Sequence, residues 1–266
     1  MPGTKITAPI PMPTRDFLTE VALGLHDGYS LVHKFGFNSA VGTSLEPITS
    51  AGVYQTPTST VTLAAISSDA DDTAAGAGAQ QITVQYLDST FTEQTDTIEM
   101  NGTTETTDTI TGVLRVYRVW VSRSGTYATS STPSQQGTIT IRVENAGSTW
   151  ATIPLADTGF GAGQSQIAWY TVPSGYTAYI LSFFISVDTN QSADIFFFKR
   201  ENADDTSSPY SGVMRAQNSY IGVNGVLTID HKTNESYPAM TDIGFLGKAA
   251  ANAEISCEFE LLLKAN

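Results

Sequence analysis

The feature that most restricts how this chain can fold is a period-two alternation of apolar and polar residues. It is clearest in residues 253–264, AEISCEFELLLK, where apolar side chains alternate with Glu and Ser. A period of two puts the apolar residues on one face of a β-strand and the polar residues on the other. We therefore predict a half-buried strand whose inward residues are Ile255, Cys257, Phe259, Leu261 and Leu263.

The same period recurs along most of the chain. Segments 61–66, 81–86, 137–143 and 179–187 alternate in this way, and 195–200, 225–230 and 243–247 are shorter strand candidates. The predicted inward residues are Val61, Leu63, Ala65, Ile82, Val84, Tyr86, Ile139, Ile141, Val143, Tyr179, Leu181, Phe183, Ile185 and Val187. Segment 113–121, VLRVYRVWV, is apolar on both faces and is predicted to be a central strand. The dipeptide Asn101-Gly102 predicts a hairpin turn, because both residue types tolerate positive φ.

Composition agrees with a β-protein. Charged residues make up 15% of the chain, against about 25% in ordinary globular proteins. Uncharged polar residues replace them, above all Thr, whose β-branched side chain suits a pleated surface. One short helix is predicted over 14–25, where Thr14 can cap the first turn and Phe17, Leu18, Val21 and Leu25 form an apolar stripe.

The domain prediction follows from two breaks in this pattern. Four prolines before residue 14 exclude regular structure there, so residues 1–28 are predicted to form an extended N-terminal arm and the short helix. The polar stretch 144–148 then divides the rest into 29–147 and 148–266. We expect an all-β fold of two tandem antiparallel β-sandwich or jelly-roll domains.

Charge and hydropathy exclude several classes of partner. The chain has 26 acidic and 13 basic residues and a net charge of -13. Such a surface repels phosphate backbones and anionic membranes, so we expect no nucleic acid and no membrane partner. No secretory leader or span of 18 apolar residues is evident, and the single cysteine permits no internal disulfide. We expect a soluble protein made in a reducing cytoplasm.

Residues that could carry chemistry are few, and none forms a catalytic or metal-binding pattern. Cys257 lies in register with core positions, and Gly76 and Gly78 are not followed by the Lys-Ser/Thr of a phosphate loop. The acidic loops leave calcium binding open, although their spacing lacks the EF-hand frame. We predict no catalytic residue, no cofactor and no metal site after considering His26, His33, His231, Asp69, Asp71, Asp72, Asp204 and Asp205.

Several stretches of the chain resemble virion structural proteins of tailed bacteriophages, especially phages from aquatic environments. The resemblance is carried by residues 30–48, 67–104, 137–147, 169–187 and 241–264. It implies that the chain is part of the virion, after synthesis in the host cytoplasm, and it implies no position on the particle.

Charge and composition favour one position. A strongly negative wall would repel packaged DNA, which favours the outer surface of the head or the tail. We therefore predict a non-enzymatic capsid decoration or cement protein, a homo-oligomer (a trimer) that binds the major capsid protein or other virion proteins. The predicted interface residues are the arm anchors and two strand aromatics, namely Ile6, Ile10, Met12, Phe196 and Phe198.

Two other functions stay open. One is a neck or tail component, such as an adaptor or a fibre-attachment protein. The other is a carbohydrate-binding receptor module that would use Trp120, Trp150 or Trp169 as a stacking platform.

Overall fold

The computed structural model describes residues 16–155, 162–231 and 235–266, and these residues form four antiparallel sheets and one short helix. The prediction of a mostly β, antiparallel protein is confirmed. The helix, α1 (Phe17–Ala22), is shorter than predicted. Asp16 occupies the N-cap position without a side-chain hydrogen bond, and Thr14 lies outside the described residues.

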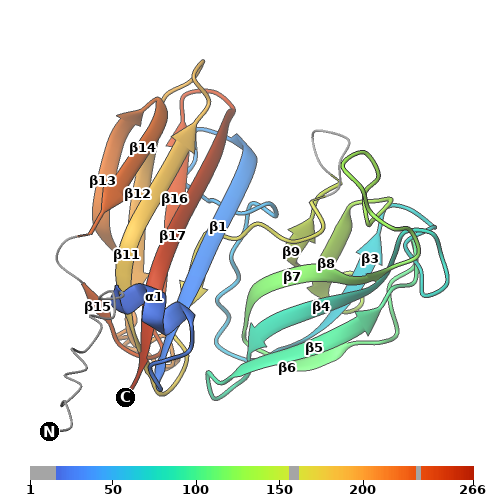
Figure 1. Cartoon of the computed structure of the whole chain (residues 1–266), viewed down its shortest axis with the longest axis horizontal. Helices are drawn as coiled ribbons and strands as arrows, with labels where there is room; N and C mark the ends of the chain where they lie inside the picture. Colours follow the sequence, from blue (N-terminus) through green and yellow to red (C-terminus); the bar gives the residue numbers. More distant parts are fainter. Residues whose placement is uncertain (1–15, 156–161, 232–234) are drawn as a thin grey trace, which may run out of the picture.

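Two five-stranded sheets face each other in what we call the terminal module (Figure 1, left). One has the order β1-β17-β11-β14, with β15 pairing with β11; the other has the order β10-β16-β12-β13, with β2 pairing with β16. The bounds are β1 (Tyr29–Val41), β2 (Glu46–Pro47), β10 (Trp169–Thr171), β11 (Tyr176–Val187), β12 (Ala193–Arg200), β13 (Arg215–Val223), β14 (Gly225–Asp230), β15 (Ser236–Tyr237), β16 (Asp242–Ala249) and β17 (Ala253–Ala265).

Two smaller sheets form what we call the middle module (Figure 1, right). Their orders are β6-β3-β8-β9 and β5-β4-β7. The bounds are β3 (Val61–Ser67), β4 (Ala79–Leu87), β5 (Glu93–Glu99), β6 (Ile110–Val113), β7 (Arg115–Ser124), β8 (Ile139–Val143) and β9 (Thr149–Ile153).

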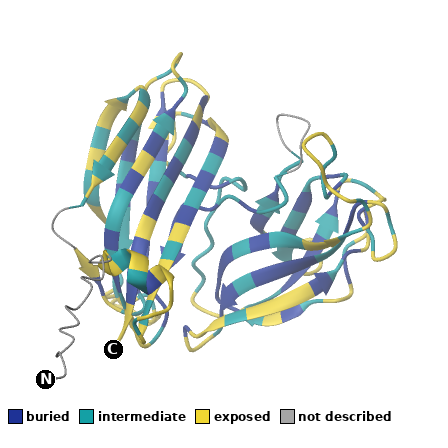
Figure 2. Cartoon of the chain, in the orientation of Figure 1, coloured by how far each residue is buried: buried dark blue, intermediate teal, exposed yellow. Residues whose placement is uncertain are grey.

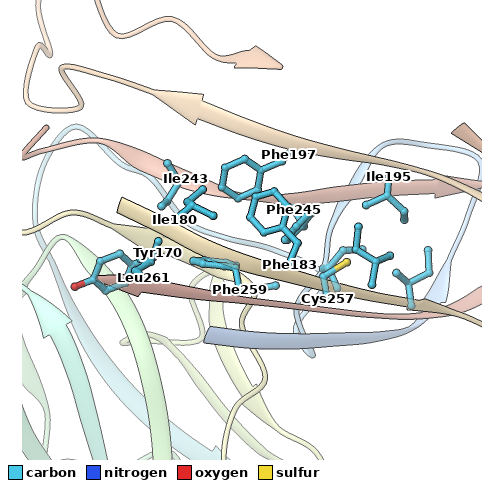
Figure 3. Close-up of a cluster of buried hydrophobic side chains, with 14 of the residues drawn as sticks. Tyr170, Ile180, Phe183, Ile195, Phe197, Ile243, Phe245, Cys257, Phe259 and Leu261 are labelled. Carbon is cyan, nitrogen blue, oxygen red and sulfur yellow. The ribbon is translucent and has the colours of Figure 1, made fainter. Parts of the chain in front are cut away.

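Each module has its own apolar core between its two sheets, and Figure 2 shows the alternation of buried and exposed residues along the strands. In the terminal module, Phe183 of β11 contacts Phe197 of β12 with ring centroids 4.7 Å apart (Figure 3). All five predicted inward residues of β17 are buried in this core. Leu63, Ile82 and Ile141 fill the core of the middle module, as their alternation predicts.

The predicted division at residue 147 does not follow the strand pairing. β1, assigned by sequence to the first domain, pairs with β17 along nearly its whole length. β9 lies beyond the predicted boundary, yet it pairs with β8 of the middle module. The modules are therefore not consecutive: the middle module lies between β2 and β10 in the chain, and the fold is not two jelly rolls in tandem.

Two local predictions also need correction, the hairpin at Asn101-Gly102 and the inward residues at the start of β11. Gly102 has a positive φ of 62°, but β5 and β6 on either side belong to different sheets and form no hairpin. A register shift between Ile180 and Ser182 turns Ile180 inward, so Tyr179 and Leu181 are only half-buried. Such a bulge reverses which residues face the core.

The strand β7 is an outer member of its three-stranded sheet. Its apolar character on both faces has a different cause from the one predicted. Val116 and Val119 fill the core of the middle module, whereas Tyr117 is buried in the core of the terminal module. β7, a strand of the middle module, therefore contributes side chains to the cores of both modules.

Candidate functional site

A buried ionic network joins the two modules. Arg115 of β7 donates through Nε to Asp242 of β16 at 3.1 Å, and both side chains are almost wholly inaccessible to solvent. Arg200 donates through Nε to the other carboxylate oxygen at 2.9 Å. Burial alone would raise the pKa of Asp242, but the Arg115 and Arg200 guanidinium groups hold it below its usual value. The network therefore keeps a charged carboxylate inside the junction.

A cleft of about 480 Å³ lies between the modules. Its walls come from β1, from β4, β5 and β7 of the middle module, and from the β10–β11 connection. The cleft brings together two buried polar side chains, Lys34 and Tyr170, and three charged or titratable groups, His33, Glu93 and Arg118.

Lys34 is the most unusual residue of the cleft, because it points inward from β1 at a position that belongs to the core face. It is buried, and its Nζ donates to the Tyr117 carbonyl oxygen at 2.5 Å. The same Nζ lies 5.8 Å from the centroid of the Tyr117 ring. Burial, aided by the neighbouring Arg118, lowers the pKa of Lys34 to about 7, although Glu93 acts in the opposite direction.

Tyr170 is the second polar group of the cleft. Its ring stacks on that of Tyr117 with centroids 4.6 Å apart. The Tyr117 hydroxyl donates to the Thr171 carbonyl, whereas the Tyr170 hydroxyl is buried and has no hydrogen-bond partner among the described residues. Figure 3 shows the Tyr170 hydroxyl at the margin of the core cluster, directed away from Ile180.

The outer face of the β1-β17-β11-β14 sheet is a second candidate surface, which we call the outer sheet face. α1 crosses one end of it (Figure 1). There the Phe17 ring packs edge-on against the Tyr29 ring, with the ring centroids 5.4 Å apart. Beyond α1, the strand register places side chains in two cross-strand rows. The first row is Phe35, Glu258, Phe184 and Thr228, and the second is Phe37, Ser256, Ser186 and Val226.

Part of this face is apolar and open to solvent. Phe184 is 37% exposed and Val226 is 65% exposed. Phe35 and Phe37 are half-buried. Glu258 and Glu260 lie on β17, between β1 with Phe35 and Phe37 and β11 with Phe184. The His33 Nε2 atom lies 3.4 Å from a carboxylate oxygen of Glu258. The face thus combines aromatic and acidic side chains.

The sequence-predicted interface residues have different positions. Ile6, Ile10 and Met12 lie outside the described residues. Phe196 and Phe198 are half-buried on β12, with ring centroids 6.2 Å apart. Phe198 packs against the core of the middle module, so it serves a contact within the chain.

Asp72, in the first of the acidic loops, has a structural role. The Asp72 carboxylate is buried and accepts hydrogen bonds from Ser67 Oγ at 2.6 Å and from the backbone N–H groups of Ala79, Gln136 and Gly137. It therefore fixes the loops around it. Within the described residues, no group of three or more His, Cys, Asp or Glu side chains is placed to hold a metal ion.

Other residues considered from the sequence are mostly structural. Cys257 is buried in the core, which raises the pKa of its thiol well above the usual value. Trp150 and Trp169 are buried as well, so they form no sugar-stacking platform. Trp120 is the one of the three that is partly exposed. In the described part of the chain, no helix is long and apolar enough to span a membrane.

Sequence reasoning missed Lys34, Tyr170 and Asp242. A signal for Lys34 existed, because alternation within LVHKFGF places it on the same strand face as Val32 and Gly36. Asp242 had no local signal, since its partner Arg115 is 127 positions away in the sequence.

Comparison with known proteins gives no family. No family model matches the chain, and no curated protein matches it. Among solved structures, a structure of infectious bursal disease virus Gt strain matches with a TM-score of 0.14 and 8% identity, covering 95% of this chain and 86% of the other. A mutant VP2 protein of the same virus, from T=1 particles, gives a TM-score of 0.11 at 8% identity, covering 90% and 78%. Similarity this low does not establish a common fold.

Proposed function

We propose that this chain is a non-enzymatic structural protein of a tailed-phage virion, and that it decorates the outer head shell. The observation that carries the proposal is the outer sheet face, where exposed apolar side chains lie beside a column of glutamates. Exposed apolar area of this kind marks interaction surfaces. The sequence resemblance to phage virion proteins supports the same function.

The strand order of the terminal module also supports the proposal. Its antiparallel pairs are β1 with β17, β10 with β16, β11 with β14, and β12 with β13. These pairs are nested like one long hairpin wrapped into two sheets, which is the plan of an eight-stranded jelly roll. We infer one jelly roll with the middle module inserted between its first two strands. Viral capsid and lectin domains use this architecture, and that support is an analogy at the level of fold.

The chemistry of the outer sheet face specifies the kind of partner. Phe184 and Val226 favour an apolar contact, and Glu258 and Glu260 favour lysine or arginine on the opposing surface. A standard interface buries roughly 800 Å² per partner. At about 25 cal/mol per Å² of buried apolar area, such an interface leaves a favourable net binding free energy after the cost of ordering the side chains is subtracted. We propose that the outer sheet face contacts the capsid protein. We also propose that the protein binds the shell as a homotrimer.

The test is rebinding of purified protein to particles that lack it. The double variant Phe184→Ser, Val226→Ser should rebind at least about tenfold more weakly, because roughly 1.4 kcal/mol of apolar contact corresponds to a factor of ten. The matched control is Ile221→Ser, since Ile221 is 68% exposed on β13 of the opposite sheet. Equal rebinding by the double variant and the control would refute the role of this face.

A second candidate function is carbohydrate binding, which the lectin use of the jelly roll and the partly exposed Trp120 favour. Binding on a glycan array that is lost in Trp120→Ala would support it. An array with no signal would remove it.

A further inference from the structure

We propose that the cleft between the modules is a binding site for a small organic carboxylate, with the Lys34 ammonium group as its charge partner and the Tyr170 hydroxyl as a hydrogen-bond donor. This inference does not depend on the proposed virion function, because it concerns a different surface of the molecule.

Lys34 has hydrogen-bonding capacity that the described residues do not use. An ammonium group has three N–H donors, and the described residues provide one acceptor for Nζ, the Tyr117 carbonyl. Lys34 is 4% exposed, so water has little access to the remaining donors. A buried cation needs a charge partner or further acceptors. A carboxylate in the cleft would supply both.

The Tyr170 hydroxyl is a second unpaired polar group of the cleft. It is buried without a partner among the described residues, and a buried hydroxyl left unpaired is destabilising because it has lost its hydrogen bonds to water. Tyr170 and Lys34 line the same cleft, and both contact Tyr117, one through ring stacking and the other through the carbonyl. A two-oxygen acceptor between them would satisfy both groups.

The charged side chains that line the cleft differ in burial and in sign. Lys34 is buried, whereas Glu93 on β5 is exposed and accepts a hydrogen bond from Gln85 Nε2 at 2.7 Å. Arg118 on β7 adds a second cation, and His33 on β1 is held near Glu258. Among the charged side chains that line the cleft, Lys34 and Arg118 outnumber Glu93, which favours an anion over a cation in a protein that is acidic as a whole.

The size of the cleft limits the ligand. A volume of about 480 Å³ lies within the usual range of small-molecule pockets and accommodates a molecule the size of one sugar ring. Glucuronate is therefore a suitable probe, because it joins a carboxylate to a ring of that size. Glucose is the matched uncharged control.

The experiment is titration calorimetry of the full chain with glucuronate and glucose at pH 6.5. We expect saturable one-to-one binding of glucuronate with a Kd of about 1 mM, as for a weak site of few contacts, and none of glucose. Tyr170→Phe keeps the stacked ring and should weaken binding about tenfold, whereas Tyr220→Phe, outside the cleft, should leave it unchanged. No binding of glucuronate, or equal binding of glucose, would overturn the proposal.

A second measurement assigns the charge partner. Because the pKa of Lys34 is lowered to about 7, carboxylate binding should take up a proton above that pH. The affinity should fall up to about tenfold per pH unit above 7, and the binding heat should depend on the ionisation enthalpy of the buffer. An affinity that stays constant between pH 7 and 9 would contradict the role of Lys34. A variant of the outer sheet face that binds glucuronate normally but no longer attaches to virions would bear on the proposed virion function and not on the carboxylate site.

Discussion

Replacing Asp242 by Asn tests whether the buried ionic network holds the two modules together. The substitution keeps the size of the side chain but removes the negative charge that faces Arg115 and Arg200. Arg115 is 1% exposed, so its guanidinium group cannot reach water without opening the junction. Two cations would then face each other without a counter-charge.

The expected cost follows from the burial of each partner. Removing one member of a buried ion pair typically costs about 3–5 kcal/mol, because the remaining charge stays desolvated. The Arg200 side chain is 20% exposed and can turn partly toward solvent, and Arg115 keeps its hydrogen bond to the Leu114 carbonyl at 2.8 Å. We therefore expect Asp242→Asn to lower the free energy of unfolding by about 3 kcal/mol. This is a large part of the 5–15 kcal/mol that stabilises an ordinary domain.

The assay is urea unfolding followed by tryptophan fluorescence. The matched control is Glu99→Gln, which breaks the exposed ion pair with Arg123. In this pair the Arg123 side chain is 48% exposed and the Glu99 side chain is 40% exposed. An exposed pair contributes about 0–1 kcal/mol. A free energy of unfolding for Asp242→Asn within 1 kcal/mol of that control would refute the account of the junction.

Three further predictions concern other parts of the molecule. Lys34→Met should stabilise the protein more at pH 6 than at pH 10. The reason is that the lowered pKa of Lys34 makes the free energy of unfolding of the wild type rise with pH between about 7 and 10.4. Equal changes in the free energy of unfolding at both pH values, measured by chemical denaturation, would contradict this. Gly244→Ala should cost about 1–3 kcal/mol, since its Cβ would lie 2.2 Å from Trp169 Cδ2, whereas Gly42→Ala, with 3.5 Å to its nearest neighbour, should leave the melting temperature nearly unchanged. Deleting residues 1–13 should leave circular dichroism unchanged and weaken particle attachment; attachment equal to that of the full chain would exclude docking by the arm.

The strands could be predicted from the sequence where the alternation is local and uninterrupted. β17 is the clearest case, with all five inward residues as expected. The prediction was wrong only in the first part of β11, where a register shift after Ile180 reverses the side-chain directions; Phe183, Ile185 and Val187 beyond it are buried as predicted. A bulge depends on how the neighbouring strands pair, and alternation within one segment carries no record of it.

The arrangement of the strands could not be predicted in the same way. β1 pairs with β17, and His33 and Glu258 on these strands are 225 positions apart. A polar stretch at 144–148 marks a turn between β8 and β9 rather than a domain boundary. The cleft was missed for the same reason, because Lys34, Glu93 and Tyr170 meet only through pairing of distant segments.

The proposal that this protein serves virion assembly as a decoration of the head shell predicts how many copies of it each particle carries. Quantitative mass spectrometry of purified particles should find on the order of hundreds of copies per virion, as a repeated shell lattice requires. A dozen or fewer would assign the chain to the neck or tail instead. Absence from purified virions would contradict the account.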